Sequence, residues 1–346
     1  MELEWTADTV RGGQQRGVRV RTPAKINLYL EIIGERPDGF HDIDSLFQAV
    51  SLYDTIDFAT ELSSASDRLE VTGAPGRQEA ALPQPEGNLV LRAAALVRKA
   101  AKRHGRGDRT TGRLRIRLEK AIPMGAGLGG GSSDAAATLL ALNRLWNLEL
   151  SQSALSALAC QLGSDVPFFL YGGLAHCSGR GEKVRPLPDS PTEPLHFVLV
   201  SPSIEVPTPQ IYQEYRRQRQ RGLALTTLKP LTTIPPSSFS DGIKRGGLLQ
   251  NRLQPVAFCL FPALRLLYEA LTAEPFVKVL MTGSGSTFFG VCRGQEDADD
   301  LSERLEARVL GPRPLGELSA FGQRGAFGPT TIKKVHGLPG WSAQGL

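Results

Sequence analysis

The sequence lacks any apolar run long enough to span a bilayer, and its first 17 residues mix acidic and basic side chains without an apolar stretch. We therefore expect neither a membrane span nor a secretory signal, and we expect a cytoplasmic protein without membrane contact. The sequence also has only four cysteines, none of them in a CxxC pair. We interpret them as buried free thiols in a reducing compartment, which argues against a disulfide scaffold. These are Cys160, Cys177, Cys259 and Cys292.

The charge balance is only moderately basic, with a formal net charge of +5. This fits an anionic substrate without requiring one. The densest basic run, Arg216 to Arg221, comes at the end of a helix that we expect to begin near Thr208-Pro209. Cations are favourable at a helix C-terminus, and no aromatic side chains are interleaved with this run. We therefore expect no nucleic-acid partner.

The chain of 346 residues is longer than one hydrophobic core usually serves, so two domains are expected. The strand and helix patterns, separated by Pro- and Gly-rich segments, divide the chain into four parts. We expect a flexible tail at residues 1–17, a first domain at 18–195, a second domain at 196–310 and an irregular tail at 311–346.

The most informative stretch runs from Pro123 to Asp134 and holds five glycines within seven positions. It is followed by a pattern of alanine and leucine typical of a helix. Glycine permits positive φ and close backbone approach, and a helix N-terminus presents free N–H groups to an anion. The stretch therefore predicts a phosphate site, with the Ser132 and Ser133 hydroxyls as further donors.

Two familiar nucleotide sites fit this stretch poorly. The glycine spacing matches a dinucleotide fingerprint, but the preceding strand alternates leucine and isoleucine with arginine, whereas a Rossmann strand is buried on both faces. A P-loop requires a lysine before the serine, and Gly131-Ser132-Ser133 has none. A different glycine-rich loop that holds a triphosphate is the alternative that these observations leave.

This stretch resembles the ATP-binding motif of the GHMP kinases. Two further motifs of that family occur in the expected order, Pro23 to Leu28 and Thr282 to Ser286. The resemblance covers residues 20 to 310. It implies an α+β protein with the two-domain GHMP kinase fold: an N-terminal mixed-sheet domain with the ATP loop, and a C-terminal ferredoxin-like α/β sandwich. One departure lies at Arg252 and Gln254, where the family commonly has acidic residues.

The resemblance also implies the residues of a kinase site. Lys25 and Asp165 are the implied catalytic pair, with Asp165 accepting the proton of the substrate hydroxyl and Lys25 orienting it. ATP is the implied cofactor together with Mg²⁺, for which we see no dedicated acidic ligands and only Ser132 as a possible one. The implied ATP-binding residues are Pro123, Met124, Gly125, Ala126, Gly127, Leu128, Gly129, Gly130, Gly131, Ser132, Ser133, Asn88 and Lys120.

Within the family, the segments Arg36–His41, Leu162–Phe168 and Val206–Tyr212 are similar to those of the branch that phosphorylates a cytidyl-linked polyol in non-mevalonate isoprenoid synthesis. The implied substrate-binding residues are Asn27, Phe40, His41, Phe47, Thr208 and Tyr212. A homoserine- or mevalonate-type kinase is the alternative, and a non-catalytic nucleotide-binding regulator is a further one. We expect a monomer or a weak homodimer.

Overall fold

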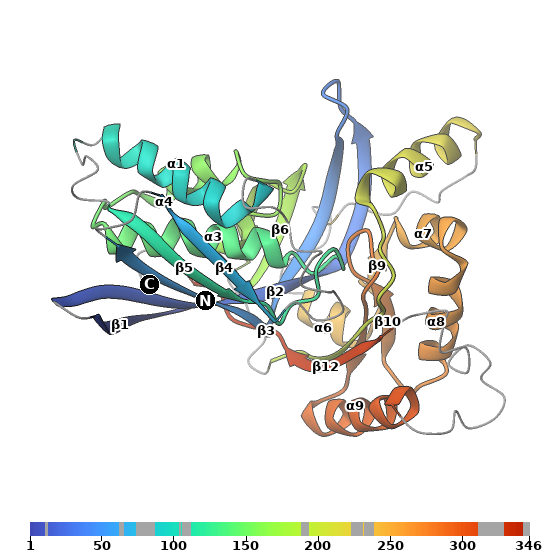
Figure 1. The fold of residues 1–346 in the computed structure, drawn as a ribbon. Coiled ribbons are helices and arrows are strands. Elements are labelled where there is room, and N and C mark those ends of the chain that lie inside the picture. The colour runs from blue at the N-terminus through green and yellow to red at the C-terminus, as the bar shows by residue number, and fades with distance from the viewer. Residues whose placement is uncertain are drawn as a thin grey trace.

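The computed structural model has two lobes, each built on its own β-sheet (Figure 1). It describes residues 1–10, 13–61, 66–73, 87–103, 105, 112–187, 194–222, 231, 239–310 and 329–341. None of the helices in these ranges combines the length and the apolar character needed to cross a membrane.

The N-terminal lobe contains an eight-stranded sheet in which most neighbours are antiparallel. Its main path has the order β1-β2-β3-β5-β4, while β6 pairs with β3 and β7, and β9 pairs with β2. The strands are β1 (Glu2–Val10), β2 (Gly13–Glu35), β3 (His41–Glu61), β4 (Arg68–Thr72), β5 (Arg113–Glu119), β6 (Leu174–Gly179), β7 (Lys183–Pro186) and β9 (Gln250–Asn251). The pairing of β2 with β3 shifts register between Pro23 and Ala24, and β2 continues across this shift.

Helices cover one face of this sheet (Figure 1). They are α1 (Leu89–Arg103), α3 (Gly130–Leu145), α4 (Gln152–Ala159) and the 3₁₀ turn η3 (Pro167–Leu170). The apolar side chains of β5 enter the core beneath them, and the alternating arginines do not. This one-sided burial agrees with the pattern that argued against a Rossmann strand.

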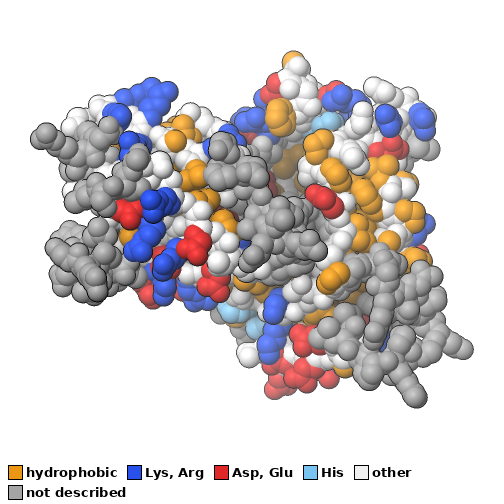
Figure 2. All heavy atoms as spheres, in the orientation of Figure 1, with side chains coloured by type: hydrophobic (Ala, Val, Ile, Leu, Met, Phe, Trp, Pro, Cys, Tyr) orange, Lys and Arg blue, Asp and Glu red, His pale blue; other side chains and the backbone are white. Residues whose placement is uncertain are grey.

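The C-terminal lobe contains a four-stranded antiparallel sheet in the order β10-β11-β8-β12. These strands are β8 (His196–Ser201), β10 (Lys278–Met281), β11 (Phe288–Cys292) and β12 (Thr331–His336). The accompanying helices are α5 (Thr208–Gln220), α6 (Phe239–Lys244), α7 (Gln254–Leu260), α8 (Pro262–Thr272) and α9 (Gln295–Leu310). Figure 2 shows acidic side chains gathered over α9, at the end of this lobe opposite α5.

Both faces of the C-terminal sheet are apolar, and alternate residues of β8 serve different cores. Val198 and Val200 pack with the helices of their own lobe, whereas Phe197 and Leu199 pack with a cluster that includes Ile26 of β2. A sheet that is buried on both faces needs apolar residues at consecutive positions, which β8 has. The two lobes are therefore joined by a continuous apolar interface, which fixes the position of β2 between them.

Both predicted tails differ from the structure. Residues 2–10 form β1, the edge strand of the sheet, and pair with residues 13–21 of β2. Residues 331–336 form β12 and pair with β8, because Ile332 and Val335 reach the apolar clusters on opposite faces of the sheet. Residues 11–12, 311–328 and 342–346 of these tails lie outside the described residues, as does most of the Pro-, Thr- and Ser-rich segment 225–240.

The prediction for the cysteines also needs correction, and the unusual Arg252 has a partner. Cys177 and Cys292 are buried as expected, but Cys160 is only half-buried and Cys259 is exposed on α7. The unusual Arg252 forms a bidentate ion pair with Glu31 of β2, with N–O distances of 2.7 and 2.5 Å, and both side chains are buried. The basic residue at this position thus has an acidic partner on the other lobe.

Candidate active site

The glycine stretch forms a loop whose backbone alternates into the left-handed region. Gly125, Gly127 and Gly129 have φ values of 68°, 80° and 71°. Residues with a Cβ rarely adopt this conformation, so glycine is needed at all three positions. Helix α3 begins directly after Gly129. The loop therefore ends with the free N–H groups of a helix N-terminus.

The loop also packs closely against β2. A Cβ at Gly129 would lie 3.0 Å from Cγ of Lys25 and 3.0 Å from the ring of Phe169. The backbone N–H of Lys25 donates to the carbonyl of Leu128 at 2.9 Å. This close approach brings the Lys25 side chain beside the glycine loop.

A first cavity of about 420 Å³ lies on one side of the loop. It is lined by Asn88, Lys120 and every residue from Pro123 to Ser132, together with apolar side chains such as Leu89 and Leu118. Asn88 also caps α1, because its side-chain oxygen accepts the N–H of Val90 at 2.9 Å. An apolar wall beside a helix N-terminus suits a nucleoside triphosphate, since the helix end attracts the phosphates.

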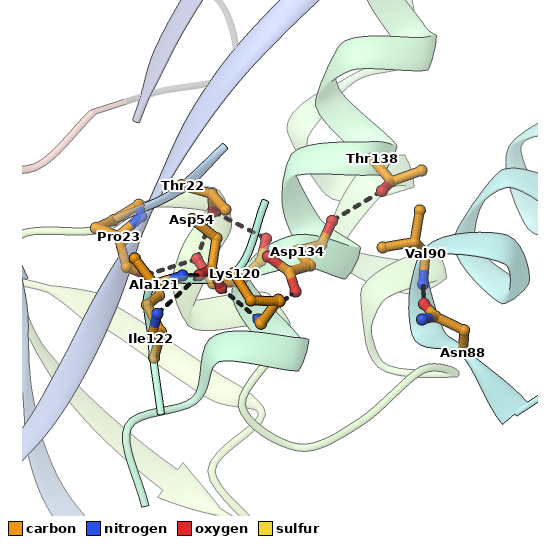
Figure 3. A network of polar contacts seen from close by, with 11 residues as sticks. Thr22, Pro23, Asp54, Asn88, Val90, Lys120, Ala121, Ile122, Asp134 and Thr138 are labelled. Atoms are coloured by element: carbon orange, nitrogen blue, oxygen red, sulfur yellow. Dashed lines mark hydrogen bonds and ion pairs between the residues drawn. The ribbon is translucent and has the colours of Figure 1, made fainter. Parts of the chain in front are cut away.

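A buried ionic network connects the elements on either side of the loop (Figure 3). The Lys120 ammonium lies between the carboxylates of Asp54 on β3 and Asp134 on α3, at 2.8 Å from the latter. Asp54 also accepts the backbone N–H groups of Ala121 and Ile122 at 2.6 and 2.8 Å. The network therefore ties β3, the start of the loop and α3 together.

The contacts within this network shift the pKa values of Asp134 and Lys120. Burial raises the pKa of Asp134 to about 7, against the opposing effect of Lys120, and the neighbouring Asp54 raises it further. For Lys120, burial alone would lower the pKa, but the two carboxylates outweigh it and raise the pKa. Because the Lys120 ammonium is committed to these carboxylates, it lines the cavity without being a free cation there.

Ser133 does not fit the predicted phosphate role. Its hydroxyl is fully buried and donates to the carbonyl of Pro23 at 2.6 Å, and it also contacts the Thr22 hydroxyl. One helical residue earlier, Ser132 is partly buried and lines the cavity. Successive helical side chains point about 100° apart, so only one of the two serines can face the ligand.

A second cavity of about 390 Å³ lies on the other side of the loop and shares Gly125, Gly127 and Gly129 with the first. Lys25 and Asp165 both line it, and the Lys25 ammonium lies 3.4 Å from the Asp165 carboxylate. Lys25 is almost fully buried, whereas the Asp165 side chain is 31% exposed. The pair therefore lies where a group bound in one cavity would meet a group bound in the other.

The glycine-containing turn at residues 282–286 closes this site from the C-terminal lobe. The Thr282 hydroxyl accepts the N–H of Asn27 at 3.0 Å and donates to its side-chain oxygen at 3.2 Å. Lys25 donates to the same oxygen at 2.6 Å. Asn251 holds the turn by donating to the carbonyls of Met281 and Gly283 at 2.6 and 2.7 Å. Asn27 is thereby fixed beside the Lys25–Asp165 pair.

The predicted substrate residues divide into two groups. Asn27, Phe47, Thr208 and Tyr212 line the second cavity with the Lys25–Asp165 pair. Phe40 and His41 do not. Phe40 lies just before β3 and is 50% exposed, while His41 begins β3 and is buried against the rings of Tyr212 and Tyr215, at 5.0 and 5.9 Å. Burial, followed by the nearby Arg216, lowers the pKa of His41, which favours the neutral ring.

Sequence reasoning missed Arg180, Asp54 and Asp134. Arg180 lines the second cavity, and its signal was a cation between two glycines at residues 179–181. Asp54 and Asp134 had no sequence signal of their own, because they meet Lys120 only through the packing of three separate elements. Within the described part of the chain, no group of three or more His, Cys, Asp or Glu side chains could hold a metal ion.

Comparisons with known proteins agree with this architecture. Residues 88–173 match the model of the GHMP kinases N terminal domain, and residues 235–310 match that of the GHMP kinases C terminal domain. L. major mevalonate kinase in complex with R-mevalonate has the same fold, with a TM-score of 0.67 at 14% identity over 93% of this chain and 96% of that one. The glycine loop and the two lobes thus define the class of GHMP kinases, which confirms the predicted fold.

Proteins with higher sequence identity to this chain indicate a particular branch of the GHMP kinases. The 4-diphosphocytidyl-2-C-methyl-D-erythritol kinase of Pelotomaculum thermopropionicum is 39% identical over 298 residues, covering 84% of this chain and 97% of that protein. A chloroplastic kinase of the same name from Arabidopsis thaliana is 37% identical over 79% of this chain and 67% of its own length. A crystal structure of 4-(cytidine 5'-diphospho)-2C-methyl-D-erythritol kinase aligns with a TM-score of 0.68 and 35% identity, covering 92% of this chain and 99% of that one. The chain belongs to the 4-diphosphocytidyl-2-C-methyl-D-erythritol kinase family.

Proposed function

We propose that this protein transfers the γ-phosphoryl group of ATP to the 2-hydroxyl of 4-diphosphocytidyl-2-C-methyl-D-erythritol. The observation that carries the proposal is the junction of two cavities at three shared glycines, with Lys25 and Asp165 beside it. The names of the relatives supply the substrate.

ATP would occupy the first cavity. Gly130, Gly131 and Ser132 form the first turn of α3. Their backbone N–H groups would bind the phosphates, and the helix dipole would add to the attraction. Asn88 and the apolar wall would surround the nucleoside. Lys120 would act by holding the start of the loop.

The residues around the loop fit a magnesium ion that arrives with the triphosphate. The two nearby carboxylates, Asp54 and Asp134, both pair with Lys120, and the Ser132 hydroxyl is a candidate ligand from the chain itself. Mg²⁺ retains several waters in such sites and neutralises charge on the phosphates.

Asp165 would accept the proton of the attacking hydroxyl. Lys25 holds the Asp165 carboxylate in place at 3.4 Å and would stabilise charge on the transferring group. Phosphoryl transfer depends more on positioning and charge stabilisation than on a strong base, so a carboxylate beside a lysine suits this reaction. Asn27 fixes the lysine through its 2.6 Å hydrogen bond.

The substrate would occupy the second cavity, with its cytidine end toward α5. Tyr212 offers a ring face and Thr208 a hydroxyl, which already contacts Ser284 at 2.7 Å. Stacking of a base on such a ring is worth about 1–3 kcal/mol. Phe47 lies beneath the Lys25 ammonium and forms the floor. His41 would act through Tyr212, against which it packs.

A direct assay distinguishes this function from its alternatives. ADP formation is measured with Mg-ATP and either the cytidyl substrate, mevalonate or homoserine, and Asp165→Asn provides the background rate. We expect ADP with the cytidyl substrate alone. ADP with mevalonate or homoserine instead would support the alternative kinases, and nucleotide binding without turnover would support a regulator. A place in isoprenoid synthesis, a cytoplasmic location, and a monomeric or weakly dimeric state stay predictions from the sequence.

A further inference from the structure

The buried ion pair between Glu31 and Arg252 joins β2 to the segment that follows β9. The Arg252 guanidinium donates to both carboxylate oxygens of Glu31, at 2.7 and 2.5 Å. The Arg252 and Glu31 side chains are only 9% and 4% exposed. The backbone N–H of Arg252 also donates to the carbonyl of Leu30 at 2.8 Å. Arg252 is therefore anchored to two successive residues of β2, through its side chain and through its backbone.

The residues on either side of this arginine hold the glycine-containing turn at residues 282–286. The Asn251 side chain donates to the carbonyls of Met281 and Gly283 at 2.6 and 2.7 Å. The side-chain oxygen of Gln254 accepts the N–H of Met281 at 2.7 Å. The segment anchored by the ion pair is thus the same segment that fixes the entry of the chain into the turn.

The turn in its turn contacts the groups around the proposed site of transfer. The Thr282 hydroxyl accepts the N–H of Asn27 and donates to its side-chain oxygen, which also accepts from Lys25 at 2.6 Å. A Cβ on Gly127 would lie 2.4 Å from the Thr282 carbonyl, so the glycine loop packs directly on the turn. Asn27 and Glu31 both belong to β2. The contacts therefore form a closed ring that begins and ends on this strand.

We propose that the Glu31–Arg252 pair positions the 282–286 turn for phosphoryl transfer. The inference rests on the proposed function. Neither residue is among the described residues that line the two cavities, so the pair acts through the turn and Asn27. Transfer depends on the placement of the reacting groups, and a displacement of about 1 Å can slow such a step about 100-fold. The N–H groups at the start of α3 lie outside the ring, so ATP binding should depend on it little.

The first measurement is the rate of a single turnover with Mg-ATP and the cytidyl substrate both saturating. Glu31→Gln and Arg252→Gln should each lower this rate about 10- to 100-fold. The double variant should be no slower than the slower single variant, because the two side chains act as a unit. Arg252→Lys retains the charge and should recover part of the rate. The Kd of a non-hydrolysable ATP analogue should change less than about twofold in all four variants.

The second measurement is hydrogen–deuterium exchange of the turn, which requires no reaction. The Thr282 N–H donates to the Thr287 carbonyl, and the Gly285 N–H donates to the Thr282 carbonyl. The exchange of these amides therefore reports how firmly the turn is held. We expect it to be about 10-fold faster in Arg252→Gln than in the wild-type protein.

The matched control is Arg98→Gln, which breaks another partly buried ion pair. The Arg98 guanidinium donates to both carboxylate oxygens of Asp67 at 2.8 and 3.0 Å, and neither residue is among the described residues that line the two cavities. This variant should unfold at a lower temperature, but its transfer rate and the exchange of the turn should stay within about twofold of wild type.

The outcomes separate the inference from the proposed function. Unchanged transfer or unchanged exchange in Arg252→Gln would overturn the inference, and so would an equal loss of transfer in Arg98→Gln. A wild-type protein that transfers no phosphoryl group to the cytidyl substrate would overturn the proposed function, and the role of the pair in transfer with it.

Discussion

The Lys25 ammonium lies 3.4 Å from the Asp165 carboxylate, although the two residues come from opposite sides of the glycine loop in the sequence. Lys25 belongs to β2 and Asp165 to the turn before η3. The loop packs against β2 through the hydrogen bond from the Lys25 N–H to the Leu128 carbonyl. Lys25 therefore contacts the nucleotide loop with its backbone and Asp165 with its side chain.

Asp165→Asn should lower kcat by about 10³-fold, because the amide cannot accept the proton and no longer pairs with the Lys25 charge. The Kd for ATP should remain within about twofold, since Asp165 lines the second cavity and not the first. Steady-state kinetics and calorimetry measure the two quantities. A kcat near the wild-type value would remove Asp165 from the mechanism.

Gly129→Ala should lower the free energy of unfolding by about 1–3 kcal/mol, because φ is 71° and the new Cβ would press on Lys25 and Phe169. Gly131→Ala is the matched control for stability. Its nearest contact would be Leu89 at 3.7 Å and its backbone is helical, so stability should hold or rise slightly. Urea unfolding measures both variants, and equal losses would contradict this account of the loop.

Lys120→Met should lower the free energy of unfolding by about 3–5 kcal/mol, because it leaves the Asp54 and Asp134 carboxylates buried without their cation. The exposed pair Arg117–Glu70 on the same sheet provides the comparison, since both side chains are more than half exposed. Arg117→Met should cost less than about 0.5 kcal/mol. Similar losses in the two variants would show that the buried network does not stabilise the fold.

The pH dependence of stability should reveal the lowered pKa of His41. Its pKa in the folded protein lies below the ordinary value of 6.5, so the unfolded chain takes up its proton first as the pH falls. The His41 contribution to stability is therefore constant above about pH 6.5 and is lost progressively below it, down to the folded pKa. Thermal unfolding of wild type and His41→Gln between pH 7.5 and 5.5 should converge as the pH falls. Parallel curves would contradict the lowered pKa.

The sequence alone determined the local features of this protein. Glycine at residues 125, 127 and 129 is needed for local backbone conformation, the alternation in β5 sets which face is buried, and the Asn88 cap starts α1. Each of these depends on neighbours within a few positions, so the residue order is sufficient to predict it. The predicted tails show the limit of this reasoning, because β1 and β12 are strands only through partners that lie far away in the sequence.

The tertiary structure decided which side chains meet. It turned Ser133 toward Pro23 and left Ser132 at the cavity, paired Arg252 with Glu31, and enclosed Lys120 between two carboxylates. It also separated His41 from the second cavity and brought Arg180 to it. Such pairings depend on the packing of whole sheets and helices. In a sheet, a shift of one residue in the pairing register moves a side chain to the other face. The nucleotide loop could therefore be predicted from the residue order, whereas the charges around the proposed substrate are brought together by the packing of separate strands and turns.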